Sequence, residues 1–310
     1  MSDGTIALDA AHRRPRTAFV LAGGATRGAS QVGMLQALTE HGIRPDLIVG
    51  TSIGALNGAC FAESPTLETI DRLAHLWEAP PRSQIFSFSA RSVAQNVRQR
   101  KGYVLDNSGL RDWIRLNTSV ERLEDLTIAL HAVATDAATR RPVVLSSGDT
   151  VQALLASSAI PGVFPAITID DITLIDGGSS ADVPIGPAVG LGATTLYVLP
   201  TLPGHDTAPG LVWQFLDRVF GQPAAAAFAA DHPGVEIHRL PAPRPHDNPV
   251  SFRDSRRLID ESLALTRTYL ADHVDGRAPT AAGRVGCTRP AQDLRTPASA
   301  GRAALRRGVR

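Results

Sequence analysis

The stretch that decides the fold is DLIVGTSIGALNG, residues 46–58. A short apolar run ends at the pentapeptide GTSIG (residues 50–54), and a second apolar run, rich in small residues, follows it. The order strand, tight turn and helix is the setting in which a G-x-S-x-G pentapeptide presents a nucleophilic serine. Side chains in place of Gly50 and Gly54 would clash in so tight a turn. We therefore expect the Ser52 hydroxyl to project from the turn, near the positive end of the following helix; the alternative is a small-residue turn with an ordinary serine.

A second glycine-rich turn, AGGATRG at residues 22–28, lies between the apolar run of residues 17–22 and a predicted helix over residues 28–41. Backbone N–H groups that converge in such a turn either bind a phosphate at the helix N-terminus or form an oxyanion hole for acyl transfer. The spacing departs from the dinucleotide fingerprint, and the lysine of a P-loop is absent. Arg27 orients this loop or meets a phosphate head group; the alternative is an ordinary surface arginine.

A serine nucleophile needs a base close to its hydroxyl. Asp176 ends a predicted strand immediately before Gly177 and Gly178, so a tight turn would hold its carboxylate at the end of that strand. Nine histidines are present, and His246, in a proline-rich loop, is the best candidate for a conventional catalytic triad. Asp176 is better placed to accept the serine proton, although Asp-Gly-Gly is also a common turn sequence.

Apolar runs alternate with helical patterns along the chain. Strands are expected at residues 17–22, 46–49, 127–135, 142–145, 173–175, 194–199 and 235–240, and helices at residues 28–41, from 52, from 64, at 149–156 and at 253–274. Strands that alternate with helices predict an α/β fold with a largely parallel sheet and helices on its faces. Sites in such folds form at the carboxyl edge of the sheet, where the three glycine-rich turns are expected to meet.

Length and composition bound the domain organisation. The chain has 310 residues, 43% of them hydrophobic and 20% charged, which excludes a wholly disordered or fibrous protein. No apolar run approaches the length of a membrane-spanning helix, and we expect no signal peptide. We expect a disordered lead over residues 1–16, one catalytic domain over 17–275 with a lid-like insertion at 79–108, and a disordered tail over 276–310.

The net charge of +1 hides an asymmetry along the chain. The tail over residues 276–310 carries eight arginines and one aspartate, so the remainder of the chain is acidic overall. An acidic folded body is a poor nucleic-acid binder, which needs a basic face. The two cysteines, Cys60 and Cys287, form neither a disulfide framework nor a zinc site.

Four motifs, taken in order, resemble the patatin-like phospholipase family. They are LAGGATRGASQVGML (21–35), GTSIGALNGA (50–59), ASSAIPGVFPAITID (156–170) and LIDGGSSADVPI (174–185), and the resemblance extends over about residues 17–200. It implies a patatin-type, three-layer α/β/α fold with a nucleophile elbow at a strand-helix turn. It also implies hydrolysis of lipid acyl esters by a Ser-Asp dyad that uses no histidine. From the residues themselves we expect no cofactor and no metal.

The resemblance assigns a role to each matching residue. Ser52 is the nucleophile and Asp176 the base, and the amides of Gly23, Gly24 and Ala25 form the oxyanion hole. The residues that support these motifs are Arg27, Gly28, Gly50, Gly54, Gly177 and Gly178.

Two positions depart from the family pattern. Ala25 stands where the family usually has a third glycine, and a methyl group is tolerated there if φ is negative; on that condition we expect an intact oxyanion hole. Residues 181–184, Ala-Asp-Val-Pro, replace the Asn-Asn-Val-Pro that is frequent in the family, so Asp176 loses amide side chains from its surroundings.

The expected partner is a lipid or phospholipid ester, with peripheral membrane contact through residues 91–104 or the basic tail and no nucleic acid. The expected location is the cytoplasm, and the oligomeric state is left open. Two other classes of function remain at this stage. One is a nucleotide- or phosphate-binding module that uses the glycine-rich loop, and the other is a catalytically silent patatin-like domain that acts through protein contacts.

Overall fold

The computed structural model describes residues 16–78, 96, 98–99, 102–203, 234–244 and 252–274. The predictions for the lead over 1–16, the insertion over 79–108 and the tail over 276–310 lie wholly or mostly outside these residues, as does His246. Within the described ranges, no helix combines the length and the apolar character that crossing a membrane requires.

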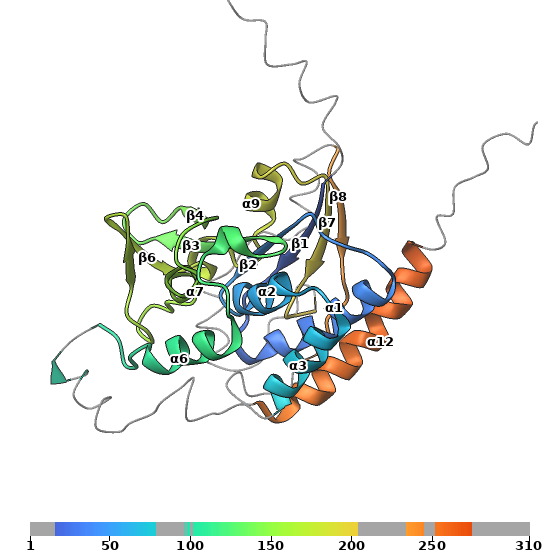
Figure 1. Cartoon of the computed structure of the whole chain (residues 1–310), viewed down its shortest axis with the longest axis horizontal. Helices are drawn as coiled ribbons and strands as arrows, with labels where there is room; N and C mark the ends of the chain where they lie inside the picture. The colour runs from blue at the N-terminus through green and yellow to red at the C-terminus, as the bar shows by residue number, and fades with distance from the viewer. Residues whose placement is uncertain are drawn as a thin grey trace, which may run out of the picture. The chain divides into compact units, whose positions relative to one another are not determined.

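One mixed sheet forms the centre of the fold (Figure 1). Its strands are β1 (Thr17–Leu21), β2 (Leu47–Thr51), β3 (Ala129–Asp136), β4 (Pro142–Leu145), β5 (Ile167–Ile169), β6 (Ile172–Asp176), β7 (Thr195–Leu199) and β8 (Glu236–Arg239). The order across the sheet is β5-β6-β3-β2-β1-β7-β8, with β4 also paired to β3. The run from β3 to β8 is parallel, whereas β4, β5 and β6 pair antiparallel. The predicted α/β class with a largely parallel sheet is confirmed.

The helices described follow the glycine-rich turns and the strands. They are η2 (Ala25–Gly28), α1 (Ala29–Glu40), α2 (Ile53–Glu63), α3 (Leu67–Glu78), α6 (Ser108–Asn117), η3 (Leu123–Asp125), α7 (Thr150–Ser157), α8 (Gly178–Ala181), α9 (Ile185–Gly190), η4 (Phe252–Asp254) and α12 (Ser255–His273). Three of them, η2, α2 and α8, begin directly at the three predicted turns, so each turn joins a strand to a helix.

Side chains on the strands alternate between two cores, because successive residues of a strand point to opposite faces of the sheet. On β1, Phe19 and Leu21 belong to the larger core, together with α1, α2, α3 and α12. Ala18 and Val20 belong to the smaller core, which α8 and α9 cover. The described residues therefore form three layers, with helices on both faces of the sheet.

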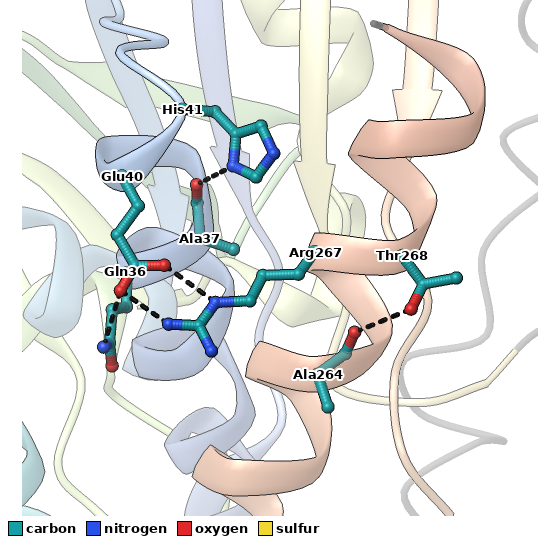
Figure 2. Close-up of polar contacts among 7 residues, drawn as sticks. All are labelled: Gln36, Ala37, Glu40, His41, Ala264, Arg267 and Thr268. Carbon is teal, nitrogen blue, oxygen red and sulfur yellow. Dashed lines mark hydrogen bonds and ion pairs between the residues drawn. The ribbon is translucent and has the colours of Figure 1, made fainter. Parts of the chain in front are cut away.

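The α1 and α12 helices pack side by side in Figure 1 and contact each other closely because of one glycine. A Cβ atom at Gly33 would lie 2.2 Å from the carbonyl oxygen of Ile259. Beside this contact the Ser262 hydroxyl donates a hydrogen bond to the Ser30 carbonyl at 2.7 Å. At the far end of α1, Arg267 forms two hydrogen bonds of 2.8 Å with Glu40 (Figure 2). The final helix is thus fixed to the helix that begins at the loop over residues 22–28.

Some local predictions were wrong. The strand β5 and the helix α6 were not predicted. The helix expected from residue 64 begins at Leu67, and the hydroxyl of Thr66 accepts a hydrogen bond from the Thr69 N–H at 3.2 Å. In α12, the packed face runs through Leu258, Ser262 and Thr266, and Leu265 is 41% exposed.

Replacing Gly33 by alanine should destabilise the protein. The added methyl group meets main-chain atoms of α12, which cannot move aside, so we expect a loss of about 1–3 kcal/mol in the free energy of unfolding. Gly190→Ala is the matched control, because a Cβ atom there meets nothing within 4 Å. Urea unfolding of both variants measures the difference. A Gly33→Ala protein as stable as Gly190→Ala would contradict the close packing.

Candidate active site

Ser52 occupies a strained position between β2 and α2. Its backbone has φ 53° and ψ −120°, a conformation that costs a non-glycine residue about 1–3 kcal/mol. Close packing leaves no room for side chains at the flanking glycines: a Cβ atom at Gly54 would lie 2.3 Å from the Leu21 carbonyl oxygen, and one at Gly50 2.7 Å from the Ala55 backbone. This is the predicted elbow, and Ser52 is the N-cap residue of α2.

Two hydrogen bonds hold the backbone of the strained turn in place. The Ser52 N–H donates a hydrogen bond to the Ser157 hydroxyl at 2.9 Å, and that hydroxyl donates to the Val133 carbonyl at 2.7 Å. Ser157 ends α7, and Val133 lies on β3, next to β2. The Ser52 backbone is therefore held by two neighbouring elements while its side chain stays 9% exposed, open to the pocket described below.

Asp176 reaches the same region by an unpredicted route. We expected parallel strands to meet at one edge, but β6 runs antiparallel to β3. The strand β6 overlaps only the last residues of β3, and Asp176 pairs with Ala134. The preceding residue of β3, Val133, pairs with Thr51 on the other side. The two registers bring Asp176 level with Ser52 across β3.

The Asp176 side chain is buried, with 2% of its surface exposed. One carboxylate oxygen accepts a hydrogen bond from the Gly178 N–H at 2.7 Å. Burial raises the pKa of Asp176 to about 7, and the charge of Asp182 also raises it. The Ser52 hydroxyl and the Gly178 amide act in the opposite direction. The other carboxylate oxygen is buried and has no hydrogen-bond partner within the described residues, and the Ser52 hydroxyl is near enough to lower the pKa of the group. The carboxylate is a stronger base than an exposed aspartate.

The loop over residues 22–28 offers two amides rather than three. The Gly23 N–H donates to the Asp182 carbonyl at 2.9 Å and is therefore engaged. Within the described residues, the N–H groups of Gly24 and Ala25 make no hydrogen bond. The negative φ at Ala25, which was the condition for an intact oxyanion hole, is not found: φ is 51°, so this alanine lies in the left-handed region and carries strain. The oxyanion role of its amide stays a prediction.

The remaining motif residues lie around this loop. Arg27 is 5% exposed, so the surface-arginine alternative is wrong. A Cβ atom at Gly28 would lie 2.5 Å from the Ile53 side chain, which brings η2 against the start of α2. A Cβ atom at Gly177 would lie 2.1 Å from the Val133 carbonyl oxygen, so the turn after Asp176 packs directly on β3.

A buried amide network beneath the loop was not predicted. The Gln31 side-chain amide donates to the Ala22 carbonyl at 2.8 Å, and the Asn57 amide donates to the Gly28 carbonyl at 3.0 Å. Asn57 also donates to the Gln31 side chain at 2.9 Å and accepts from the Trp77 indole N–H at 3.2 Å. Both ends of the loop are thus tied to α1, α2 and α3. The available signal was Asn57 itself, the one amide in the apolar run that follows Ser52.

A largely apolar pocket opens beside Ser52 and encloses about 700 Å³ of space, part of it open to solvent. Its apolar lining includes Ile53, Leu56, Leu110, Trp113, Phe164 and Phe252. Ala25 and Thr26 border the same pocket, so the loop and the serine face one cavity. No histidine within the described ranges lines it.

The raised pKa of Asp176 has a consequence for stability. In the unfolded chain the group ionises near pH 3.8, whereas in the folded protein it ionises near pH 7, so folding stability falls as pH rises between these values. Asp176→Asn removes this penalty. We expect the variant to gain stability relative to wild type as pH rises from 3 to 8, by at most about 4 kcal/mol.

Urea unfolding of both proteins at the two pH values measures this gain. Asp171→Asn, which changes the same type of side chain at an exposed turn between β5 and β6, is the matched control and should show no such gain. An Asp176→Asn protein that is equally destabilised at both pH values would contradict a buried carboxylate with a raised pKa.

Comparisons with known proteins identify the family of the chain. The sequence model of the patatin-like phospholipase family matches residues 19–189. An uncharacterized NTE family protein of Mycobacterium tuberculosis is 30% identical over 211 residues, which cover 66% of this chain and 56% of that protein. A patatin-like phospholipase domain-containing protein 7 of Rattus norvegicus is 30% identical over 59% of this chain and 13% of its own length.

Two further similarities are more distant. A lysophospholipase of Aspergillus terreus is 28% identical over 62% of this chain and 12% of its own length. The crystal structure of VipD from Legionella pneumophila aligns over 84% of this chain and 67% of that one, with a TM-score of 0.43 and 14% identity. The chain spans about half the length of the mycobacterial relative and a small part of the larger ones. The family model covers more than half of the present chain, and the chain belongs to the patatin-like phospholipase family.

Proposed function

We propose that this protein is a lipid acyl hydrolase that cleaves fatty-acyl esters with Ser52 as nucleophile and Asp176 as base. The observation that carries the proposal is the buried Asp176 carboxylate, which the strand registers bring level with Ser52 and which has one oxygen without a hydrogen-bond partner within the described residues. Burial raises its pKa to about 7. A base titrating near neutral pH accepts a proton more readily than an exposed aspartate does. The family and the relatives named as lysophospholipases support a lipid substrate.

The reaction follows from the side chains around Ser52. Its oxygen attacks the ester carbonyl carbon while its proton moves to Asp176, and the carbonyl oxygen becomes an oxyanion that the amides of Gly24 and Ala25 stabilise. The carbon–oxygen bond to the alcohol then breaks, and Asp176 returns the proton to the leaving alcohol. Water attacks the acyl-enzyme in the same way, giving its proton to Asp176, and the fatty acid leaves as Ser52 regains a proton.

The lining of the pocket favours a fatty-acyl chain, and not a phosphate group, as the part of the ligand that binds beside Ser52. Aromatic and aliphatic side chains dominate its lining, as is usual for sites that hold apolar ligands. Phe252, which precedes α12, contributes to the wall and packs on Trp77 with ring centroids 5.7 Å apart. We therefore also propose that the catalytic unit extends past the family match to α12, in line with the domain expected over residues 17–275.

Ser52→Ala and Asp176→Asn should each lower ester hydrolysis by about 1000-fold or more, because nucleophile and base act as one unit. The assay uses p-nitrophenyl esters of increasing chain length, and Asp171→Asn serves as the matched control with wild-type turnover. Circular dichroism establishes that each variant is folded. The dyad is refuted if Asp176→Asn keeps wild-type turnover while a histidine variant loses it.

A fluorophosphonate probe separates the proposal from the two other classes of function. Covalent labelling of wild type that is absent in Ser52→Ala supports a hydrolase. Absence of labelling, combined with thermal stabilisation by a nucleotide or inorganic phosphate, supports a phosphate-binding module instead. A folded protein that neither reacts nor is stabilised matches a catalytically silent domain.

A further inference from the structure

The peptide group between Gly23 and Gly24 is held by a residue that lies outside the family motifs. The Thr201 hydroxyl donates a hydrogen bond to the Gly23 carbonyl at 2.6 Å. Thr201 is 6% exposed, and it lies beyond the family match, which ends at residue 189. The contact therefore belongs to the interior of the protein and not to its surface.

The strand register explains why Thr201 meets this carbonyl. The strands β1 and β7 are parallel, with Leu21 paired to Leu199, and the Ala22 N–H continues the pairing by donating to the Leu199 carbonyl at 3.2 Å. Two residues farther along each chain, Gly23 comes opposite Thr201. The fit is tight, because a Cβ atom at Gly24 would lie 2.2 Å from the Thr201 hydroxyl oxygen.

The order of the strands then fixes where the Gly24 N–H points. In a trans peptide the carbonyl and the N–H point in opposite directions. The strand β1 lies between β7, which leads to Thr201, and β2, which leads to Ser52. A carbonyl directed toward Thr201 therefore directs the N–H of the same peptide toward the side of the sheet where Ser52 lies.

A peptide flanked by two glycines needs such a restraint. Glycine adopts positive and negative φ with similar ease, so the Gly23–Gly24 peptide has little intrinsic preference for one orientation. The other anchor, the Gly23 N–H bonded to the Asp182 carbonyl, acts on the preceding peptide and leaves this one able to rotate. Within the described residues, it is the Thr201 hydroxyl that donates a hydrogen bond to the Gly23 carbonyl.

We propose that Thr201 is a positioning residue that orients the Gly24 amide as an oxyanion donor. The inference rests on the proposed hydrolase function. Thr201 touches neither the substrate nor Ser52 in this account. It acts through the Gly23–Gly24 peptide, so its loss should weaken stabilisation of the transition state and leave binding of the acyl chain in the apolar pocket unchanged.

The test compares Thr201→Val, which keeps the shape and removes the donor, with Thr201→Ser, which keeps the donor. For Thr201→Val we expect kcat on a p-nitrophenyl ester to fall about 10- to 100-fold, with KM within about twofold of wild type. Thr201→Ser should restore most of the lost kcat. Thr118→Val is the matched control, because the buried Thr118 hydroxyl also donates a hydrogen bond to a backbone carbonyl, that of Ile114, at 2.8 Å. The kcat of this variant should match that of wild type.

Burst titration of acyl-enzyme counts the folded active sites in each sample, and Thr201→Ala replaces Thr201→Val if the valine protein does not fold. Unchanged kcat in the variants without the hydroxyl, a change in KM alone, or a serine variant no better than valine would overturn the inference while leaving the hydrolase proposal intact. A wild-type protein that hydrolyses no ester would overturn the proposed function, and the inference with it.

Discussion

The site depends on a carboxylate that is kept away from water. Asp176 is almost fully buried, and its hydrogen bond from the Gly178 amide and its interaction with the Ser52 hydroxyl offset only part of the cost of removing a charge from solvent. The remaining cost appears as a pKa of about 7 instead of 3.8. In the proposed reaction this cost favours catalysis, because an exposed aspartate holds a proton too weakly to draw one from a serine at neutral pH. The lower stability is then the consequence of burying the proposed base.

Backbone strain is the second feature that the fold must support. Both Ser52 and Ala25 have positive φ, and both line the pocket. Neither conformation would persist in an isolated segment, so the surrounding structure has to impose it. Ser157 holds the Ser52 backbone, and the Gln31 and Asn57 amides hold the ends of the glycine-rich loop. These contacts come from helices on the larger core, which explains why a polar network is buried among otherwise apolar side chains.

The residues around the elbow could be predicted from sequence because their constraint is local. Gly50 and Gly54 are required by contacts with neighbouring backbone atoms, and this requirement is visible in a pentapeptide. The place of Asp176 at the end of a strand was predicted from the Asp-Gly-Gly turn, but the prediction that this strand runs parallel to its neighbour was wrong. A short antiparallel strand delivers it, and strand direction depends on pairing with β3, which no local pattern specifies.

The contacts that sequence could not reveal join distant segments. The Gly23 amide is engaged by the Asp182 carbonyl, a main-chain group that any residue would supply, so no side-chain signal marked it. The place of Thr201 opposite Gly23 follows from the β1–β7 register, which is known only once the sheet is assembled. Similarly, α6 and Phe252 reach the pocket through packing of elements that are far apart along the chain. The turns that carry Ser52 and Asp176 were therefore predictable from sequence, and the contacts that position them were not.

The most direct test of the account is a carboxyl-carbon NMR titration of Asp176 in wild type and in Ser52→Ala. The account predicts a wild-type midpoint near pH 7. It also predicts a higher midpoint in Ser52→Ala, because the hydroxyl that stabilises the ionised carboxylate is gone. A wild-type midpoint near the ordinary value of 3.8, or a midpoint that does not move when the hydroxyl is removed, would contradict it.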